Sequence, residues 1–305
     1  MKHGVDKACS RKPLYNPKTT RRRLHNIPQL VYNEAFTNNG VGKVFSPAAF
    51  NVAWHQYQGH LVKRLNEMTA GHPSSNKETK EILLANARNP NQAALFNHAS
   101  MAWNNHHFFT TLSPSPTPMT DHLITRLSGS FSSIESFRAQ LLATAQSMFG
   151  PGFVWLIRNP ASRGYRGSAS SDQGNPANDP EFTILCTYIA GSPLPGAHPR
   201  VQSVDMNTEN SQSVMNSAGA IGPYSGNAES TISPGRIARA EICLGVNTWE
   251  HCWMHDRGVG SEGKRAYLDA WWDSIDWETV ERNAAMDSYG GGRNRLPRAG
   301  EGLYR

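Results

Sequence analysis

Apolar residues recur every three to four positions across most of the first 110 residues, which is the spacing of helices with one buried face. The longest run predicts a single helix over residues 46–70, because Ser46 can cap its start and Pro47 suits the first helical position. The same spacing predicts a short helix over residues 75–88 and a third from residue 93 to about 109. The front half of the chain is therefore expected to be helical.

A proline-rich stretch over residues 112–118 cannot be helical and ends this region. The pattern then changes to short runs of β-branched and aromatic residues, which are typical of strands. The elements expected after the break are a helix over residues 120–128, a helix from the Ser132-x-x-Glu135 capping box to Met148, strands over residues 153–157, 182–188 and 242–246, and a last helix over residues 264–283. Helices followed by strands and a closing helix indicate an α+β fold.

Two stretches between the expected strands lack apolar periodicity and are rich in Ser, Asn and Gly. They cover residues 159–180 and 195–237, and we interpret both as surface insertions that become ordered only where a partner covers them. The predicted organisation is a presequence or basic arm over residues 1–30, a helical hairpin domain over residues 31–118, an α/β domain with both insertions over residues 119–285, and a basic tail over residues 286–305.

Charge is concentrated at the ends of this chain of 305 residues. The net charge is +6, yet residues 1–23 alone carry +7, so the remainder is close to neutral. Basic tails can bind phosphate backbones through counterion release. The candidate RNA-binding residues are Arg21, Arg22, Arg23, Arg293, Arg295 and Arg298. The N-terminal stretch is equally typical of a solvated tail, or of a mitochondrial presequence cleaved near residues 21–24.

The four cysteines form no C-x-x-C pair, and we expect them to act as small apolar residues in a reducing compartment. They are Cys9, Cys186, Cys243 and Cys252. The chain also contains no run of about 18 apolar residues, so no membrane-spanning segment and no membrane partner are expected.

A series of short motifs occurs in order between residues 44 and 284. They are Phe45-Ser46-Pro47, Leu65-Asn66, Phe96-Asn97, Trp103-Asn104, Ser130-Phe131, Phe149-Gly150-Pro151-Gly152 with Trp155-Leu156, Ala190-Gly191-Ser192-Pro193-Leu194, Trp249-Glu250-His251, and Tyr267-Leu268 with Trp272, Trp277 and Asn283. In this order and at this spacing, the chain resembles the iron/manganese superoxide dismutases. The resemblance implies an N-terminal helical hairpin followed by a three-stranded antiparallel sheet with flanking helices.

That family holds a redox metal with three His and one Asp. The resemblance places the four ligand positions at Ala53, Asn105, Asn247 and His251, and only the last could serve. It therefore implies no metal, no cofactor and no catalytic residues. A shift of one residue along the second helix would bring His106 to the position of Asn105, but the carboxylate and the first-helix His would still be missing.

Glu250 and His251 have a second role in the family, where the Glu of one subunit reaches the ligand His of the other. The resemblance therefore implies an interface of the dismutase dimer type at these two residues, with a related chain as partner. The alternative is that Glu250 only caps local structure. As for metal binding, we interpret His251 as a buried, hydrogen-bonded histidine rather than a metal ligand.

A dismutase fold without its ligands, with basic tails and polar insertions, resembles the superoxide-dismutase-like proteins of the fungal mitochondrial ribosome's small subunit. This resemblance implies a structural, non-enzymatic protein of the mitochondrial matrix that pairs with a paralogue and contacts other small-subunit proteins. Contacts to ribosomal RNA would come through the basic tails, and we expect protein contacts to dominate because the body is nearly neutral. The other hypotheses are a divergent active dismutase and a free pseudoenzyme regulator.

Overall fold

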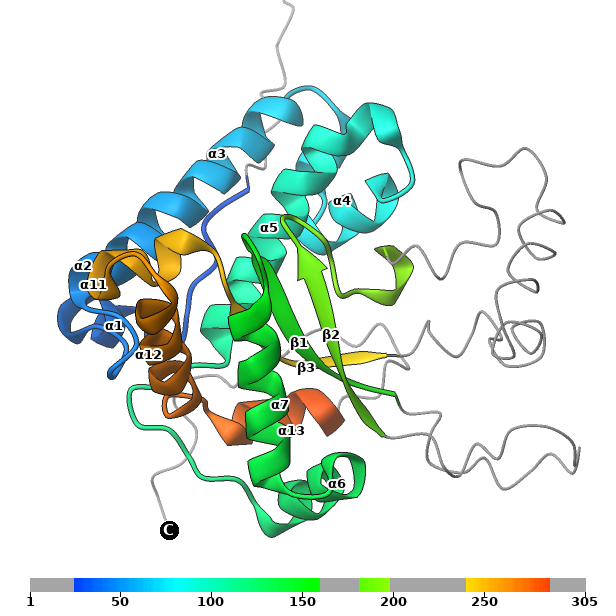
Figure 1. The fold of residues 1–305 in the computed structure, drawn as a ribbon. Helices are drawn as coiled ribbons and strands as arrows, with labels where there is room; N and C mark the ends of the chain where they lie inside the picture. Colours follow the sequence, from blue (N-terminus) through cyan, green and yellow to red (C-terminus); the bar gives the residue numbers. More distant parts are fainter. Residues whose placement is uncertain (1–24, 160–180, 198–239, 286–305) are drawn as a thin grey trace, which may run out of the picture.

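The protein is described by a computed structural model over residues 25–159, 181–197 and 240–285. The first half is helical, as predicted. Its elements are α1 (Asn33–Asn39), α2 (Pro47–Phe50), the π-helix η1 (Asn51–Gln56), α3 (Tyr57–Met68), η2 (Pro73–Asn76), α4 (Thr79–Asn86), η3 (Pro90–Gln92) and α5 (Ala93–Thr110). Helices α3 and α5 form the two arms of a hairpin, and α4 packs against α5 (Figure 1).

The second half contains the sheet and the remaining helices. Its elements are α6 (Asp121–Phe131), α7 (Ile134–Ser147), β1 (Gly152–Arg158), β2 (Phe182–Tyr188), η6 (Pro195–Ala197), β3 (Glu241–Asn247), η8 (Glu250–Cys252), α11 (Met254–Arg257), α12 (Ser261–Trp272) and α13 (Trp277–Ala285). The strands form one antiparallel sheet in the order β2-β1-β3. Helices α5 and α13 pack against β3, whereas α7 and α6 pack against β1 and β2 (Figure 1). The predicted α+β fold is confirmed.

The helix predicted over residues 46–70 is one continuous helical stretch, but its middle is a π-helix. Ser46 caps the start as expected, because its Oγ accepts a hydrogen bond from the Ala49 N–H. Within the wide turn of η1, the Tyr57 N–H reaches back five residues to the Val52 carbonyl. The apolar spacing did not predict the π-helix, because one wide turn shifts the buried face of a helix by only one residue.

The prediction of a single last helix over residues 264–283 is wrong. Helix α12 ends at Trp272 and α13 begins at Trp277, because the chain between them pairs with residues 111–113: the Asp276 N–H bonds to the Thr111 carbonyl at 2.9 Å. The apolar pattern continues across the break because both helices bury aromatic residues against the same core.

The capping box predicted at Ser132 is displaced by one residue. Ser133 is the N-cap of α7, and its Oγ accepts from the Ser136 N–H at 3.1 Å. Ser132 has a φ of 71° and ends α6 instead.

The sheet is fixed to the helices by an aromatic core that leaves no room beside β3. The Trp155 indole on β1 is fully buried and donates to Thr187 Oγ1 at 2.9 Å. A Cβ at Gly245 on β3 would lie 2.4 Å from the Trp155 ring, so only glycine fits there. Asn247 lies two residues further along β3, at the end of the strand.

Several predictions fall outside the described residues. They include all six candidate RNA-binding arginines and nearly all of both insertions. Of the cysteines in the described ranges, Cys243 and Cys252 are buried as predicted, whereas Cys186 is exposed on β2. Over the same ranges, no helix is long and apolar enough to cross a membrane.

Candidate functional site

Three of the positions that the resemblance assigns to metal ligands meet in one buried place. Ala53 lies in η1, Asn105 on α5 and Asn247 at the end of β3, and all three are fully buried. Asn105 joins the other two: its Nδ2 donates to the Ala53 carbonyl at 3.2 Å, and its Oδ1 accepts from Asn247 Nδ2 at 3.4 Å. The structure therefore brings these residues together as a hydrogen-bonded amide cluster.

Gln58 is a fourth member of this cluster, and the sequence reasoning missed it. The buried Gln58 side chain accepts from Asn105 Nδ2 at 3.0 Å and donates to the Ala102 carbonyl at 3.0 Å. It thereby joins the helical stretch that contains Ala53 to α5. The available signal was a polar residue on the otherwise apolar face of the first long helix, where buried polar groups are expected to be hydrogen-bonded.

Asn247 is held from both sides. Its Oδ1 accepts from the Trp249 N–H at 2.9 Å, which is the side-chain-to-backbone bond of an Asx turn. Its backbone carbonyl accepts from the fully buried Tyr267 hydroxyl at 2.7 Å. The amide thus shapes the turn that leads from β3 into η8, where Glu250 and His251 lie.

His251 lies beside this cluster with its ring packed on aromatic side chains. Its ring centroid is 4.2 Å from that of Tyr57 and 5.8 Å from that of Trp249. Burial lowers the pKa of His251 to about 4, so the imidazole is neutral at pH 7. Within the described residues, its buried Nε2 has no hydrogen-bond partner, which differs from the hydrogen-bonded histidine expected from the sequence.

The other histidines of the front helices point elsewhere. His106 packs against the Trp54 ring, and burial lowers its pKa to about 4. His107 lies 3.2 Å from the Ile242 carbonyl through Nε2, with a pKa also lowered to about 4 by burial. Asn105, rather than His106, therefore faces Ala53.

The residues at this site do not fit an iron or manganese ion. Ala53 offers no side-chain donor, and Asn105 and Asn247 are neutral amides engaged with each other, whereas such ions are held by imidazoles and carboxylates. Across the described ranges, no group of three or more His, Cys, Asp or Glu side chains is arranged to hold a metal. These residues can fill the core with hydrogen bonds, but they lack the side-chain donors that an iron or manganese ion needs.

Glu250 lies on the same turn as His251 and close to Lys264. The Lys264 ammonium donates to the Met148 carbonyl at 2.8 Å. Burial lowers the pKa of Lys264, and the nearby Glu250 carboxylate opposes that shift. The Glu250 backbone carbonyl accepts from the Trp253 N–H, so the backbone, not the side chain, closes the local turn.

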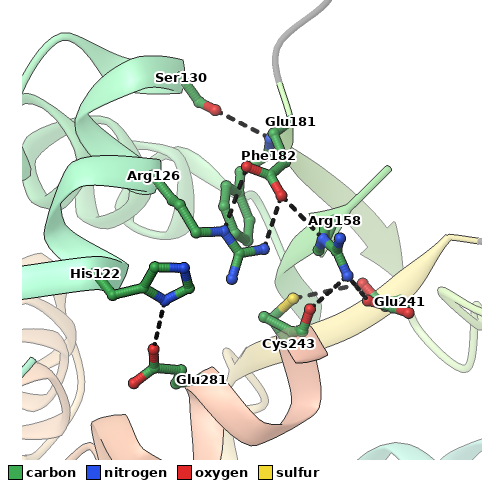
Figure 2. Close-up of polar contacts among 10 residues, drawn as sticks. His122, Arg126, Ser130, Arg158, Glu181, Phe182, Glu241, Cys243 and Glu281 are labelled. Atoms are coloured by element: carbon green, nitrogen blue, oxygen red, sulfur yellow. Dashed lines mark hydrogen bonds and ion pairs between the residues drawn. The ribbon is translucent and has the colours of Figure 1, made fainter. Parts of the chain in front are cut away.

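A second polar cluster, absent from the sequence predictions, lies at the opposite end of the sheet (Figure 2). Arg158 at the end of β1 contacts Glu181 at 3.0 Å and Glu241 at 2.8 Å, and it donates to the Ala284 carbonyl at 2.6 Å. Arg126 on α6 contacts the same Glu181 at 2.7 Å. All four charged side chains are at most 13% exposed, so these ion pairs are shielded from water.

An aromatic contact, a backbone hydrogen bond and a more exposed pair complete this end of the sheet. The Arg126 guanidinium lies over the Phe182 ring, 5.1 Å from its centroid, and Ser130 Oγ accepts from the Phe182 N–H. His122 and Glu281 form a more exposed pair at 2.8 Å between α6 and α13 (Figure 2). The cluster thus ties both ends of residues 159–181 to the start of β3 and the end of α13.

The helical hairpin and the three-stranded antiparallel sheet form a superoxide-dismutase-like fold, and three of the four positions that the resemblance assigns to metal ligands carry Ala53, Asn105 and Asn247. The C-terminal domain of the iron/manganese superoxide dismutases matches residues 119–189 and 225–283. The iron superoxide dismutase of Escherichia coli is 22% identical over 241 residues, which cover 78% of this chain and 90% of that protein.

Two ribosomal proteins are also similar. The small ribosomal subunit protein mS43 of Schizosaccharomyces pombe is 26% identical over 266 residues, covering 84% of this chain and 83% of the relative. The small ribosomal subunit protein mS42 of the same organism is 24% identical, over 73% of this chain and 81% of the relative. The resemblance to superoxide-dismutase-like small-subunit proteins, predicted from the motifs, is confirmed.

Proposed function

We propose that this protein is a structural component of the small subunit of the mitochondrial ribosome, located in the matrix, and that it has no dismutase activity. The similarity to mS43 and mS42 over most of the chain supports the ribosomal role. The fold supplies a rigid block, and the basic tails predicted from the sequence add contacts to ribosomal RNA through phosphate groups.

The amide cluster is the observation that carries the proposed absence of dismutase activity. Asn105 uses its Nδ2 on the Ala53 carbonyl and on Gln58, so the space at the ligand positions is filled by hydrogen bonds between protein groups. Amides neutralise no charge on a metal ion, and Ala53 contributes no donor at all. Such a core folds without an ion and leaves no means for electron transfer to superoxide.

The pairing of this protein with a related subunit rests on the Glu250–His251 turn. The buried Nε2 of His251 lacks a partner within the described residues, and a carboxylate from a second chain would satisfy it. Over the described ranges, the local turn is closed by the Glu250 backbone carbonyl, which leaves the Glu250 carboxylate near Lys264 available for the reciprocal contact. We infer a dimer-type interface with a superoxide-dismutase-like paralogue.

Metal analysis of the natively purified protein separates this proposal from the alternative of a divergent active dismutase. We expect well below 0.1 iron or manganese per chain by mass spectrometry of the metals, roughly the background of adventitious binding, and no superoxide dismutation. About one metal per chain with dismutase activity would refute the proposal.

Sedimentation of a mitochondrial extract tests the assembly. We expect the protein to sediment with the small ribosomal subunit and to remain bound after a wash at moderate salt. Contacts to proteins are weakened less by salt than contacts to RNA phosphates. A pool found only among free soluble proteins would favour a pseudoenzyme regulator instead.

A further inference from the structure

The two edges of the sheet differ, and the edge formed by β2 is the open one. The strand order β2-β1-β3 places β2 and β3 at the outside (Figure 1). A strand at an edge has a row of backbone N–H and C=O groups that its neighbour does not use, and these groups can pair with another chain. What covers each row decides whether that edge can bind a strand.

Hydrogen bonds at both ends of β2 fix which of its backbone groups point outward. Glu181 and Ile189 flank the strand, and each makes a backbone hydrogen bond to a residue that flanks β1, at 2.8 and 2.9 Å. In an antiparallel pair, hydrogen-bonded positions alternate with positions whose N–H and C=O point away from the partner strand. Because the register is continuous over all of β2, the groups of Ile184 and Cys186 point away from β1.

The described residues close both ends of this row and leave its middle open. At the start, the Phe182 N–H donates to Ser130 Oγ on α6 at 3.1 Å. At the end, the Tyr188 carbonyl accepts from the Gly191 N–H at 2.9 Å. Between them, within the described ranges, no backbone group bonds to the outward N–H and C=O groups in the middle of β2. The open stretch therefore lies at the centre of the strand, with both of its ends fixed.

The β3 edge, in contrast, is covered by helices. Side chains of α5, α12 and α13 contact backbone carbonyls of β3. The pairs are the Ile242 carbonyl with His107 Nε2 at 3.2 Å, the Cys243 carbonyl with Asn283 Nδ2 at 3.1 Å, and the Asn247 carbonyl with the Tyr267 hydroxyl at 2.7 Å. The pairing of β3 with β1 also contains a register shift, an irregularity that hinders strand addition. The fold thus protects one edge of its sheet and leaves the other open.

The sequence of β2 lacks the features that usually protect an open edge. Natural proteins place Lys, Pro or a bulge on such strands. The strand Phe182–Tyr188 contains no charged residue and no proline, and its pairing with β1 has no bulge. Ile184 and Leu185 are half-buried against the core, and Cys186 is exposed. Because successive side chains of a strand alternate between its two faces, the open edge is apolar on both.

We propose that the open edge of β2 binds an extended segment of a neighbouring small-subunit protein, which adds a fourth strand to the sheet. The outward donors and acceptors of Ile184 and Cys186 match the backbone of an extended peptide. RNA fits less well, because phosphates only accept hydrogen bonds and β2 contains no cation. The segment should be uncharged and apolar on both faces, since it would lie beside Ile184 and Leu185.

This inference rests on the proposed function, which supplies the neighbouring proteins. It concerns a different surface from the pairing turn at Glu250 and His251, because that turn follows β3 and β2 forms the other edge of the sheet. The protein would then contact one chain at the turn and another along β2.

Amide hydrogen exchange at residue resolution tests this geometry. The rates are measured by mass spectrometry with electron-transfer fragmentation, for the purified full chain and for the same chain in purified mitochondrial small subunits. We expect the N–H groups of Ile184 and Cys186 to exchange at least about tenfold more slowly in the subunit, because a fourth strand would pair with both. The N–H groups of Thr183 and Leu185 point toward β1 and should be slow in both samples, which provides an internal control.

Two lysine variants test the contribution of the edge itself. Cys186→Lys puts a charge on an exposed position of the open edge, which disfavours strand addition. In subunits that carry this variant, exchange at Ile184 should return to within about twofold of its rate in the free chain. Val31→Lys, at a residue 84% exposed in the turn before α1, should leave the slow exchange unchanged. Both variants should melt at the parent temperature as free chains, because both positions are exposed.

The other outcomes overturn the inference in distinguishable ways. If the chain is present in the subunit and Ile184 and Cys186 exchange as fast as in the free chain, the open edge binds no strand, and the proposed function stands. If the chain is absent from the subunit, the proposed function fails and this inference fails with it. Slow exchange in the free chain that is lost on dilution would show that the occupant is a second copy. Slow exchange beside RNA, in a density map of the same subunits, would show that the choice of a protein segment is wrong.

Discussion

Replacing Arg158 with methionine should cost about 3 kcal/mol of unfolding free energy. The substitution keeps much of the side-chain volume but removes three contacts, those to Glu181, Glu241 and the Ala284 carbonyl. Removing one partner of a buried ion pair costs about 3–5 kcal/mol, because the other charge stays buried. We expect a loss at the lower end of this range, because Glu181 keeps its ion pair with Arg126.

Urea unfolding followed by circular dichroism measures this loss, with Arg138→Met as the matched control. Arg138 also pairs with a carboxylate, Asp269, but the two side chains are 40% and 49% exposed. Exposed pairs contribute about 0–1 kcal/mol, so the control should lose about 2 kcal/mol less than Arg158→Met. Equal losses in the two variants would show that burial of the cluster at the end of the sheet does not determine its contribution.

Two further predictions concern the amide cluster and the buried histidines. Gln58→Leu should lower the free energy of unfolding by about 2–3 kcal/mol, because Asn105 and the Ala102 carbonyl each lose a hydrogen-bond partner. The control Gln56→Leu, on the exposed face, should change it by no more than about 0.5 kcal/mol. Similar urea midpoints for the two variants would contradict this. Because burial lowers the pKa of His107 and His251 to about 4, each is neutral when folded, so stability should be constant above pH 7 and fall between pH 6.5 and 4. The free energy of unfolding should change with a slope of about 1.4 kcal/mol per pH unit for each histidine, and His107→Gln should reduce that slope. An unchanged slope would refute the lowered pKa of His107.

Motifs close together in sequence predicted the fold and the convergence of the ligand positions. Ala53, Asn105 and Asn247 meet as the resemblance implied, since the motifs fix the order and spacing of helices and strands. The choice between Asn105 and His106 could not be made from sequence, because it depends on which face of α5 turns toward Ala53. That orientation is visible only in the hydrogen bonds of Asn105 and the packing of His106 on Trp54.

Features made by tertiary contacts were not predictable. The break between α12 and α13 depends on pairing with residues 111–113, far away in sequence. The ion pairs at the end of the sheet join Arg126, Glu181 and Glu241, which lie on separate elements around two polar insertions. No local pattern marks such charged residues as buried, since charged residues are usually exposed.

The amide cluster also makes single substitutions toward the family's metal ligands unfavourable. A histidine returned to position 53 alone would have to enter a fully packed space, and an aspartate returned to position 247 alone would bury a charge with no cation to balance it. Neither change alone supplies the donors that an iron or manganese ion needs, so each would lower stability without creating a metal site. On the proposed function, the amide cluster stabilises the core in place of a metal site, and no single substitution within it supplies a full set of metal donors.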